Sequence, residues 1–568
     1  MITCSAWGTA LSRNPRTDAE RLQAIQRSAR AGEFERAAAL AEAALAEGLE
    51  HPLILNVLAL RHEHAGRPAE AEPLLRRAVA LSPKDRAARN ALGLCLLRLE
   101  RGTEALEQFD ALAADEPELP HVHTNRGATL FALKRVGEAE RAFRRALELD
   151  PRQPGALAGL ARIASSRGAY AQARALSEQA VTLLPGLPDA VLTLAAVEVG
   201  EKQPVAAEGR LRALLSHADL SPALRAHAEG LLGDALDAQG RTTEAFAAYV
   251  SCNAVQRQLY SGRFAAASPS ALQYARSLVE HLERADPASW RRSASPERIS
   301  PAAEHIFILG FPRSGTTLLE VILEGHPRVV SVEESESLID GVQQFMQRPQ
   351  DLEEFARASP AVHDSLRAAY WRRVAEAGAD VAGRIFVDKN PLNTLKLPLI
   401  GRLFPHAKIL FACRDPRDVV LSCFRHRFEM SAPLYEMLTL ESAAQYYDAV
   451  MRVLLECARL LPLDICRVRH EDVVTGFARE MRRICDFLGL EWQPVMADFA
   501  PRTHARERLT PSAAQLSKGL NAEGLGHWRR YRAELEPVLP ALAPWVERFA
   551  YDEPRVSGGL SQGAILPS

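Results

Sequence analysis

Hydrophobic and small residues in the first half of the chain recur at a fixed interval of 34 residues. The interval is marked by a proline, by two small-residue positions and by one large apolar position. The members are Pro83, Pro117, Pro151 and Pro185; Ala71, Ala105, Ala139 and Ala173; Ala78, Leu112, Ala146 and Ala180; and Leu75, Phe109 and Phe143. Small residues let two helices approach closely, and a proline stops a helix. Each interval therefore predicts one pair of packed helices.

The repeated unit resembles the tetratricopeptide repeat, which has the same period and the same small, bulky and proline positions. Weaker copies flank the clear units, before them at Gly32 to Phe34 with Ala37 and Ala44, and after them at Ala207 with Leu211 and at Gly233, Gly240, Ala245 and Tyr249. About seven units are expected over residues 20–253. Stacked repeats make a curved surface on which extended peptides or partner proteins lie, although a purely structural scaffold would give the same pattern.

Short runs rich in β-branched and aromatic residues in the second half are typical of buried strands, at 305–309, 329–332, 384–388 and 408–413. The first run leads through glycines into 316–323, an apolar run long enough for a helix. Strands that alternate with helices predict an α/β domain with a central parallel sheet, whose ligand lies across the carboxyl ends of the strands.

These patterns divide the chain into an α-solenoid followed by an α/β domain with a P-loop-like turn. The expected parts are an N-terminal tail at 1–19, tetratricopeptide repeats at 20–253, capping helices and a linker at 254–303, the α/β domain at 304–552 and a flexible tail at 553–568. Near and within the linker segment, one helix is expected around Asn253 to Leu259 and a second from Ser270 to Glu283.

Composition and charge limit the kinds of partner and compartment. The 568 residues carry 69 Lys and Arg against 71 Asp and Glu, so nothing suggests a nucleic-acid partner. The N-terminus lacks the apolar core of a signal peptide, and no run is long and apolar enough for a membrane span. The eight cysteines show no CxxC pair and no metal-ligand spacing, so Cys413 and Cys423 are expected to be small core residues. We expect a cytoplasmic protein without a structural metal.

The stretch His305 to Thr317, HIFILGFPRSGTT, combines a strand, a glycine-bounded loop and a helix start. Free backbone N–H groups and the positive end of the helix dipole would converge there on one anion. Gly310 to Thr317 keeps most of the pattern GxxxxGK[ST], but Thr316 replaces the lysine that reaches the β- and γ-phosphates of a nucleotide. Arg313 supplies a cation instead. A phosphorylated ligand is expected, without ATP or GTP hydrolysis; a glycine turn that binds nothing is the alternative.

Charged residues also follow the other predicted strands. Glu333 and Glu334 end one strand, where a carboxylate would be placed as a general base or would simply be solvated. Lys389 ends another strand. Arg414 and the Ser422 hydroxyl follow a third, and together they could hold a second phosphate.

Taken together, these motifs resemble the sulfotransferases that use 3′-phosphoadenosine 5′-phosphosulfate (PAPS). The similarity runs from about His305 to Tyr551 and rests on PRSGTT, HPxVxxxEES, DKNPLN and FPxAKILFxxRDPRDVxLS. It is greatest to the tyrosylprotein sulfotransferases and to bacterial proteins that join tetratricopeptide repeats to such a domain. The resemblance implies sulfuryl transfer from PAPS, without a metal, to a hydroxyl group, with tyrosine of a peptide or protein held on the repeats as one acceptor.

The resemblance also implies roles for individual residues. Arg313, Ser314, Gly315, Thr316 and Thr317 would cradle the 5′-phosphosulfate, and Arg414 and Ser422 would hold the 3′-phosphate. Glu334 would be the catalytic base, while Lys389 and Arg313 would stabilise charge on the transferring group. Ser512 and Lys518 resemble a second serine-bearing loop that approaches the sulfate and the cofactor.

The chain departs from this family at two positions. His470 stands where many relatives have a tyrosine before the glutamate, and His527 stands where a lysine is expected before Trp528. Other readings stay open at this point. The acceptor could be a glycan or a small molecule, and the domain could be a catalytically weak scaffold that binds partner proteins. A nucleotide kinase is disfavoured by the missing loop lysine and by the lack of a clear acidic Mg²⁺ ligand after a strand.

Overall fold

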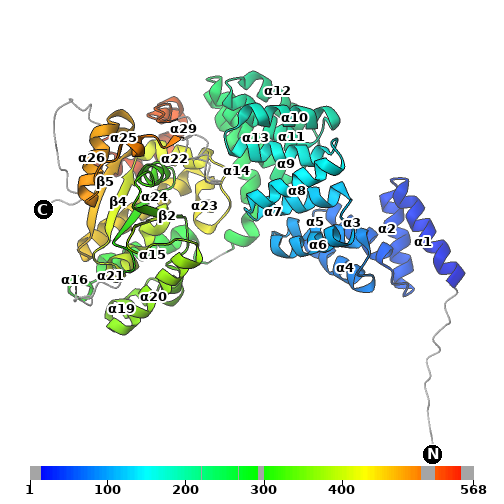
Figure 1. Ribbon diagram of the computed structural model, residues 1–568, viewed down its shortest axis with the longest axis horizontal. Coiled ribbons are helices and arrows are strands. Elements are labelled where there is room, and N and C mark those ends of the chain that lie inside the picture. The colour runs from blue at the N-terminus through cyan, green and yellow to red at the C-terminus, as the bar shows by residue number, and fades with distance from the viewer. Residues whose placement is uncertain (1–14, 219, 267, 292–299, 501–518, 552–568) are drawn as a thin grey trace, which may run out of the picture. The chain divides into compact units, whose positions relative to one another are not determined.

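The computed structural model describes residues 15–218, 220–266, 268–291, 300–500 and 519–551 (Figure 1). The predicted tail at 553–568 and most of the predicted tail at 1–19 lie outside these residues, although helix α1 begins at Pro15. The described residues form two compact units. One comprises residues up to 165 together with 169–194, and the other comprises 166–168 and the residues from 195 onward.

The repeat region consists of helices in consecutive pairs. Their bounds are α1 Pro15–Arg30, α2 Phe34–Ala46, α3 Pro52–His64, α4 Pro68–Leu81, α5 Arg86–Arg98, α6 Gly102–Asp115, α7 Pro120–Ala132, α8 Val136–Leu149, α9 Pro154–Ser166, α10 Tyr170–Leu183, α11 Pro188–Gly200, α12 Pro204–Leu215, α13 Pro222–Ala238 and α14 Thr242–Phe264. The predicted prolines, such as Pro83 and Pro117, lie just after the second helix of a pair, as expected from their inability to continue a helix.

The turn inside each of the first six pairs shows the same period in its backbone. A residue with positive φ follows the first helix of each pair, at Gly32, Gly66, Glu100, Lys134, Gly168 and Lys202, and these positions are 34 residues apart. This left-handed conformation closes a helix C-terminus. Small residues allow the close packing that the pattern predicts, since a Cβ on Gly159 would lie 2.3 Å from the Phe143 ring. The helical repeat prediction is therefore confirmed.

The second unit contains a parallel sheet, as the alternation of strands and helices predicts. Its strands are β1 Glu304–Gly310, β2 Val329–Glu333, β3 Ile385–Lys389, β4 Lys408–Cys413 and β5 Asp464–Arg469, in the order β2-β3-β1-β4-β5. The register places Lys389 of β3 opposite Glu333 of β2 and Ile308 of β1. The residues that follow these strands therefore gather at one edge of the sheet.

Helices and short 3₁₀ turns connect and cover the strands. Those described are α15 Ala271–Arg284, α16 Pro287–Trp290, α17 Thr316–Leu323, α18 Ile339–Phe345, α19 Asp351–Arg357, α20 Pro360–Glu376, η1 Pro391–Lys396, α21 Leu397–Leu403, α22 Pro416–Arg425, α23 Ala432–Tyr435, η2 Glu436–Leu438, α24 Leu440–Leu460, α25 His470–Thr475, α26 Phe477–Leu488, η3 Pro494–Ala497, η4 His527–Tyr531, α29 Arg532–Leu535, η5 Glu536–Val538 and α30 Leu539–Arg548.

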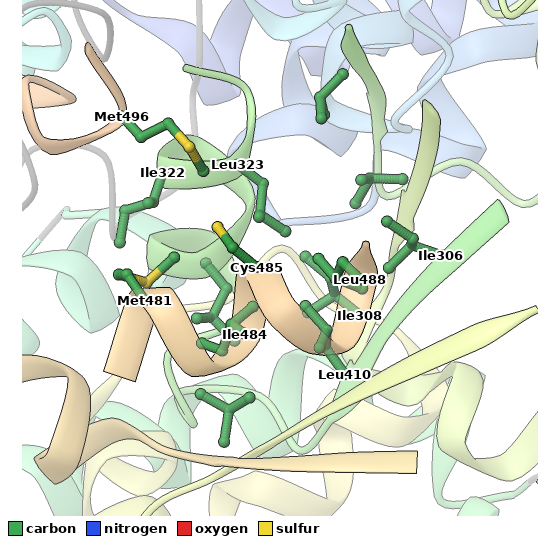
Figure 2. Packing of buried hydrophobic residues seen from close by; sticks show 14 of the residues in the cluster. Ile306, Ile308, Ile322, Leu323, Leu410, Met481, Ile484, Cys485, Leu488 and Met496 are labelled. Carbon is green, nitrogen blue, oxygen red and sulfur yellow. The ribbon is translucent and has the colours of Figure 1, made fainter. Parts of the chain in front are cut away.

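The core on one face of the sheet is formed by α17 and α26. Figure 2 shows Met481, Ile484 and Leu488 of α26 beside Ile322 of α17 and Ile308 of β1. These side chains are almost completely buried, so the apolar run of α17 holds the loop before it against the end of β1. The loop that the sequence singles out is thus fixed by core packing on its C-terminal side.

The segment between the repeats and the sheet differs in part from the prediction. The helix expected around Asn253 to Leu259 is not separate, because α14 is continuous from Thr242 to Phe264. Asn253 and Gln256 are buried on that helix, which extends the last repeat. The second expected helix is α15, capped by the Ser270 side chain. Residues 292–299 of the predicted linker lie outside the described residues.

The cysteines and the helices of the described ranges agree with a chain of ordinary core residues. The seven cysteines there are buried and unpaired, and burial raises the pKa of the Cys413 and Cys423 thiols to about 12, as suits small core residues. Among these same residues, no helix combines the length and apolar character needed to cross a membrane.

Candidate active site

The phosphate-type loop lies between β1 and α17, and its path depends on two glycines. Gly310 has φ 156° and Gly315 has φ 98°. A Cβ on Gly310 would lie 2.5 Å from the carbonyl oxygen of Ala412, and one on Gly315 would lie 2.7 Å from Nδ1 of His470. Neither position accepts a side chain without movement of its neighbour. Gly315 is also the N-cap of α17, so the free N–H groups of Thr316 and the next residues face the loop.

The residues predicted to contact the two phosphates come together around Arg313. Its Nε donates a hydrogen bond of 3.2 Å to the Ser422 hydroxyl, and Arg414 Nη1 donates one of 3.3 Å to the Arg313 carbonyl. Burial lowers the pKa of Arg313 to about 10, and the positive charge of Arg414 adds to this effect. Two guanidinium groups so close together favour the arrival of an anion between them.

The hydrogen-bond donors around Arg313 and Arg414 suit a phosphorylated nucleotide. Arg414 Nε is buried and has no hydrogen-bond partner among the described residues. Together with the Arg313 guanidinium, the Ser422 hydroxyl and the α17 N-terminus, it offers a set of donors suited to phosphate oxygens. The described residues contain no cluster of His, Cys, Asp and Glu suited to a metal ion. The donors thus fit a ligand with two phosphate-like groups.

The predicted base and lysine form an ion pair at the ends of β2 and β3. Lys389 Nζ lies 2.8 Å from Oε1 of Glu334, and the backbone N–H of Glu334 donates a bond of 3.2 Å to the Lys389 carbonyl. The Lys389 side chain is fully buried, whereas that of Glu334 is 50% exposed. An external hydroxyl group can therefore reach the carboxylate, beneath which the ammonium group lies.

The backbone of two of these residues is strained. Arg313 has φ 68° and Glu334 has φ 39°, both in the left-handed region that residues with a Cβ seldom adopt. Such conformations persist where the surrounding structure holds them, and they are concentrated at functional sites. The strain therefore agrees with a functional place for both side chains.

Sequence reasoning missed Glu320 of α17. Its Oε2 lies 3.5 Å from Lys389 Nζ, its side chain is fully buried, and its Oε1 accepts a bond of 3.1 Å from the Ser331 hydroxyl. Lys389 thus lies between two carboxylates, one buried and one exposed. The available signal was a single acidic residue inside the otherwise apolar run of α17.

The two histidines that depart from the family pattern occupy different places. The His470 ring contacts the phosphate-type loop at Gly315. Burial lowers its pKa to about 3, helped by the charges of Arg414 and Arg313, so the ring is neutral near pH 7. His527 instead contacts Arg425 and lies 3.3 Å from the Asp237 carboxylate of repeat helix α13.

The remaining predicted residues divide by position. Ser314, Thr316 and Thr317 lie in the loop and the first turn of α17, where they are buried. Ser512 and Lys518 lie outside the described residues. The structure therefore brings together Arg313, Ser422 and Arg414 in one group, and Glu334 with Lys389 in a second, along the same edge of the sheet.

Two regions of the chain are similar to known protein families. Residues 305–494 match the model of the sulfotransferase family. Residues 22–86, 64–126 and 120–153 match models of the tetratricopeptide repeat. Among solved structures, a thermophilic tetratricopeptide-repeat protein of Thermus thermophilus is 22% identical, covers 32% of this chain and 98% of its own, and has a TM-score of 0.29. The sulfotransferase domain of the Synechococcus olefin synthase is 21% identical, and the match covers 46% of this chain and 100% of that domain, with a TM-score of 0.30.

Relatives in other organisms are similar over a little less than half of the chain. A putative protein-tyrosine sulfotransferase of Caenorhabditis briggsae is 26% identical over 251 residues, which are 44% of this chain and 89% of the relative. A protein-tyrosine sulfotransferase of Drosophila melanogaster is 27% identical over 259 residues, 44% of this chain and 51% of the relative. The chain therefore joins tetratricopeptide repeats to a sulfotransferase-family domain.

Proposed function

We propose that this protein transfers a sulfuryl group from PAPS to the hydroxyl group of a tyrosine in a peptide or protein. The observation that carries the proposal is the presence of two groups of residues at one edge of the sheet. Arg313, Ser422 and Arg414 offer donors for phosphate and sulfate oxygens, and the Glu334–Lys389 pair offers a base beside a cation. This combination suits the transfer of a charged group to a hydroxyl better than binding alone.

The first group of residues holds the cofactor. Arg414 and Ser422 bind the 3′-phosphate, and the loop from Arg313 to Thr317 binds the 5′-phosphosulfate with its backbone N–H groups and the α17 N-terminus. When bound, PAPS supplies an activated sulfuryl group whose leaving group is a phosphate. The arginines compensate the negative charge that remains on that phosphate.

The second group carries the proton and the developing charge. Glu334 would accept the proton of the acceptor hydroxyl as the bond from sulfur to the leaving phosphate is exchanged for one to the acceptor oxygen, and Lys389 together with the loop N–H groups would stabilise charge on the transferred group. The 50% exposure of Glu334 gives the acceptor access from solvent, while the Lys389 side chain is fully buried beside it. The carboxylate and the ammonium group therefore act on opposite partners of the transfer.

The tyrosine acceptor is supported by the relatives, several of which are named protein-tyrosine sulfotransferases. A peptide or protein acceptor also suits the repeats, because stacked repeats provide extended surfaces for chains. We therefore assign the repeats the role of presenting the acceptor.

The test begins with binding of 3′-phosphoadenosine 5′-phosphate (PAP), the expected product, by calorimetry, with ATP as the comparison. We expect metal-independent binding of PAP that is lost in Arg414→Ala. Labelled PAPS and a set of tyrosine peptides, with phenylalanine peptides as matched controls, then report transfer. Glu334→Ala should lower turnover by about 100-fold or more while PAP binding stays near normal. Preference for Mg²⁺-ATP, or turnover that survives in Glu334→Ala, would refute the proposal.

A further inference from the structure

Asp237, on repeat helix α13, lies at the centre of a polar cluster whose other members come from the α/β domain. Its carboxylate accepts a bond of 2.7 Å from Arg425 Nη2 and one of 2.7 Å from the Tyr531 hydroxyl. Arg530 Nη2 and His527 Nε2 lie 3.1 Å and 3.3 Å from it. Burial opposes ionisation, but His527 and Arg425 outweigh it and hold the pKa of Asp237 well below its usual range. The carboxylate is therefore a charged anchor for both α22 and η4.

Asp234, one turn earlier on α13, anchors the chain just after α22. It accepts a bond of 2.9 Å from Arg427 Nη2 and one of 3.0 Å from the Tyr249 hydroxyl of α14. The stem of Arg427 passes so close to Gly230 that a Cβ there would lie 2.6 Å from it. The contact of Arg427 with α13 thus needs the Asp234 carboxylate and also a residue without a side chain at Gly230.

Two contacts from α14 complete the attachment. Asn253 Nδ2 donates a bond of 2.9 Å to the Phe424 carbonyl, and the Phe246 ring stacks on that of Phe424 at 5.3 Å between centroids. The last pair of repeat helices therefore holds residues 424–427, at the end of α22 and just after it. The contacts are a hydrogen bond to a backbone carbonyl, a stacked pair of rings and two ion pairs.

The cofactor residues are on the same elements. Ser422 lies one turn before Arg425 on α22. At the start of that helix Asp418 accepts bonds of 2.7 Å and 2.8 Å from the N–H groups of Gly526 and Trp528, at the beginning of η4. Arg414 donates to the Gly524 carbonyl in the same segment. Since Asp237 holds the end of α22 and also η4, its loss would free both elements that lie beside Arg414.

We propose that Asp237, assisted by Asp234, is a positioning residue for the 3′-phosphate half of the cofactor site, an inference that rests on the proposed function. The last repeat pair then belongs to the cofactor site as well as to the repeat array. The Asp237 carboxylate contacts Arg425 and Tyr531, and through them it acts on the placement of Ser422 and Arg414.

The test compares two ligands that differ only in the 3′-phosphate, PAP and adenosine 5′-phosphate, by calorimetry on the full chain. In Asp237→Asn, which keeps the shape of the side chain, we expect PAP to bind about tenfold more weakly and adenosine 5′-phosphate within about twofold of the unaltered protein. The KM for PAPS should rise while kcat stays nearly constant. Asp234→Asn should act in the same direction with a smaller change.

Two controls separate positioning from general loss of structure. Glu244→Gln changes an acid in the same helix pair that bonds Arg241 within the repeats, and it should leave both affinities unchanged. The double variant Asp237→Asn/Arg425→Gln should bind PAP as weakly as Asp237→Asn alone, because both changes break the same link.

Each outcome has a distinct meaning. If Asp237→Asn weakens both ligands equally, or lowers only the thermal midpoint while PAP affinity is kept, the inference is wrong and the proposed function stands. If the unaltered protein does not favour PAP over adenosine 5′-phosphate, the proposed function fails and this inference fails with it.

Discussion

Glu320→Gln is expected to weaken both the fold and the reaction through Lys389. The two charged groups lie 3.5 Å apart and both side chains are fully buried. Two unit charges at that distance attract by about 5 kcal/mol at an effective dielectric constant of about 20. Glutamine keeps an acceptor for Ser331 but leaves the ammonium group with Glu334 as counter-ion. Removing one partner of a buried ion pair lowers the free energy of unfolding by about 3 to 5 kcal/mol. Because Lys389 keeps its pair with Glu334, we expect a loss at the lower end, about 3 kcal/mol.

Urea unfolding measures the stability change, and single-turnover sulfuryl transfer measures the effect on the reaction. Turnover should fall by more than about tenfold, because Lys389 moves toward Glu334 and binds the base more tightly. Glu324→Gln is the matched control, since Glu324 lies one turn later on the chain and also contacts Ser331. Its effect on turnover should stay within about twofold.

The effect of Glu320→Gln in two backgrounds, with and without Lys389, tests whether Glu320 acts through that lysine. In a Lys389→Met background, Glu320 is a buried carboxylate that has lost this cation, so Glu320→Gln should become neutral or stabilising. An equal loss of stability in both backgrounds would mean that Glu320 does not act through Lys389.

Three further predictions follow from packing and charge. His305 is buried, its ring bonds Tyr370, and burial lowers its pKa to about 3 from the ordinary 6.5, so the folded state binds fewer protons than the unfolded state between those values. The free energy of unfolding is therefore lost as pH falls below 6.5, by about 2 kcal/mol at pH 5. In urea unfolding, His305→Gln should lose about 2 kcal/mol less than the unaltered protein between pH 7 and pH 5. Equal losses in the two proteins would contradict the assignment. Gly315→Ala should weaken PAP binding at least about tenfold in calorimetry, because of its positive φ and the ring beside it, whereas Gly378→Ala, which also has positive φ but has no atom within 4 Å of its Cβ, should leave PAP affinity unchanged. A fragment of residues 304–568 should be less stable to heat and bind PAP more weakly than one of 195–568, since it lacks the acids that pair with Arg425 at the end of α22 and with Arg427 just after it. Equal behaviour of the two fragments would show that the last repeats are dispensable.

The parts of the fold that could be predicted are those determined by nearby residues. The strand, loop and helix from His305 to Leu323 follow from a local apolar pattern and two glycines, and β1 and α17 agree with it. The repeat period was visible because helix packing and helix ends recur in one register. The helix expected around Asn253 is part of the longer α14. Its continuity with the last repeat could not be predicted, because buried polar residues such as Asn253 and Gln256 interrupt the apolar pattern.

The candidate site could be predicted only in part. Glu334, Lys389 and Arg414 could be proposed because each ends or follows a strand, and parallel strands bring their carboxyl ends together. The role of Glu320 depends on Lys389, which is distant in sequence and comes near only when β3 pairs with β1. The contact of Asp237 with Arg425 depends in the same way on packing between a repeat helix and α22, which no periodic pattern encodes.

The left-handed backbone at Arg313 and Glu334 bears on attempts to make this protein more robust. Both residues carry a Cβ at a φ that glycine tolerates without cost, so a search for stabilising substitutions would select glycine at both places. Either change would relieve the backbone strain while removing a guanidinium or a carboxylate from the site, and Glu334→Gly would also take a counter-ion from the buried ammonium group of Lys389. The protein therefore keeps two strained backbone positions in exchange for those two side chains, and a redesign that scores backbone conformation alone would be expected to remove them first.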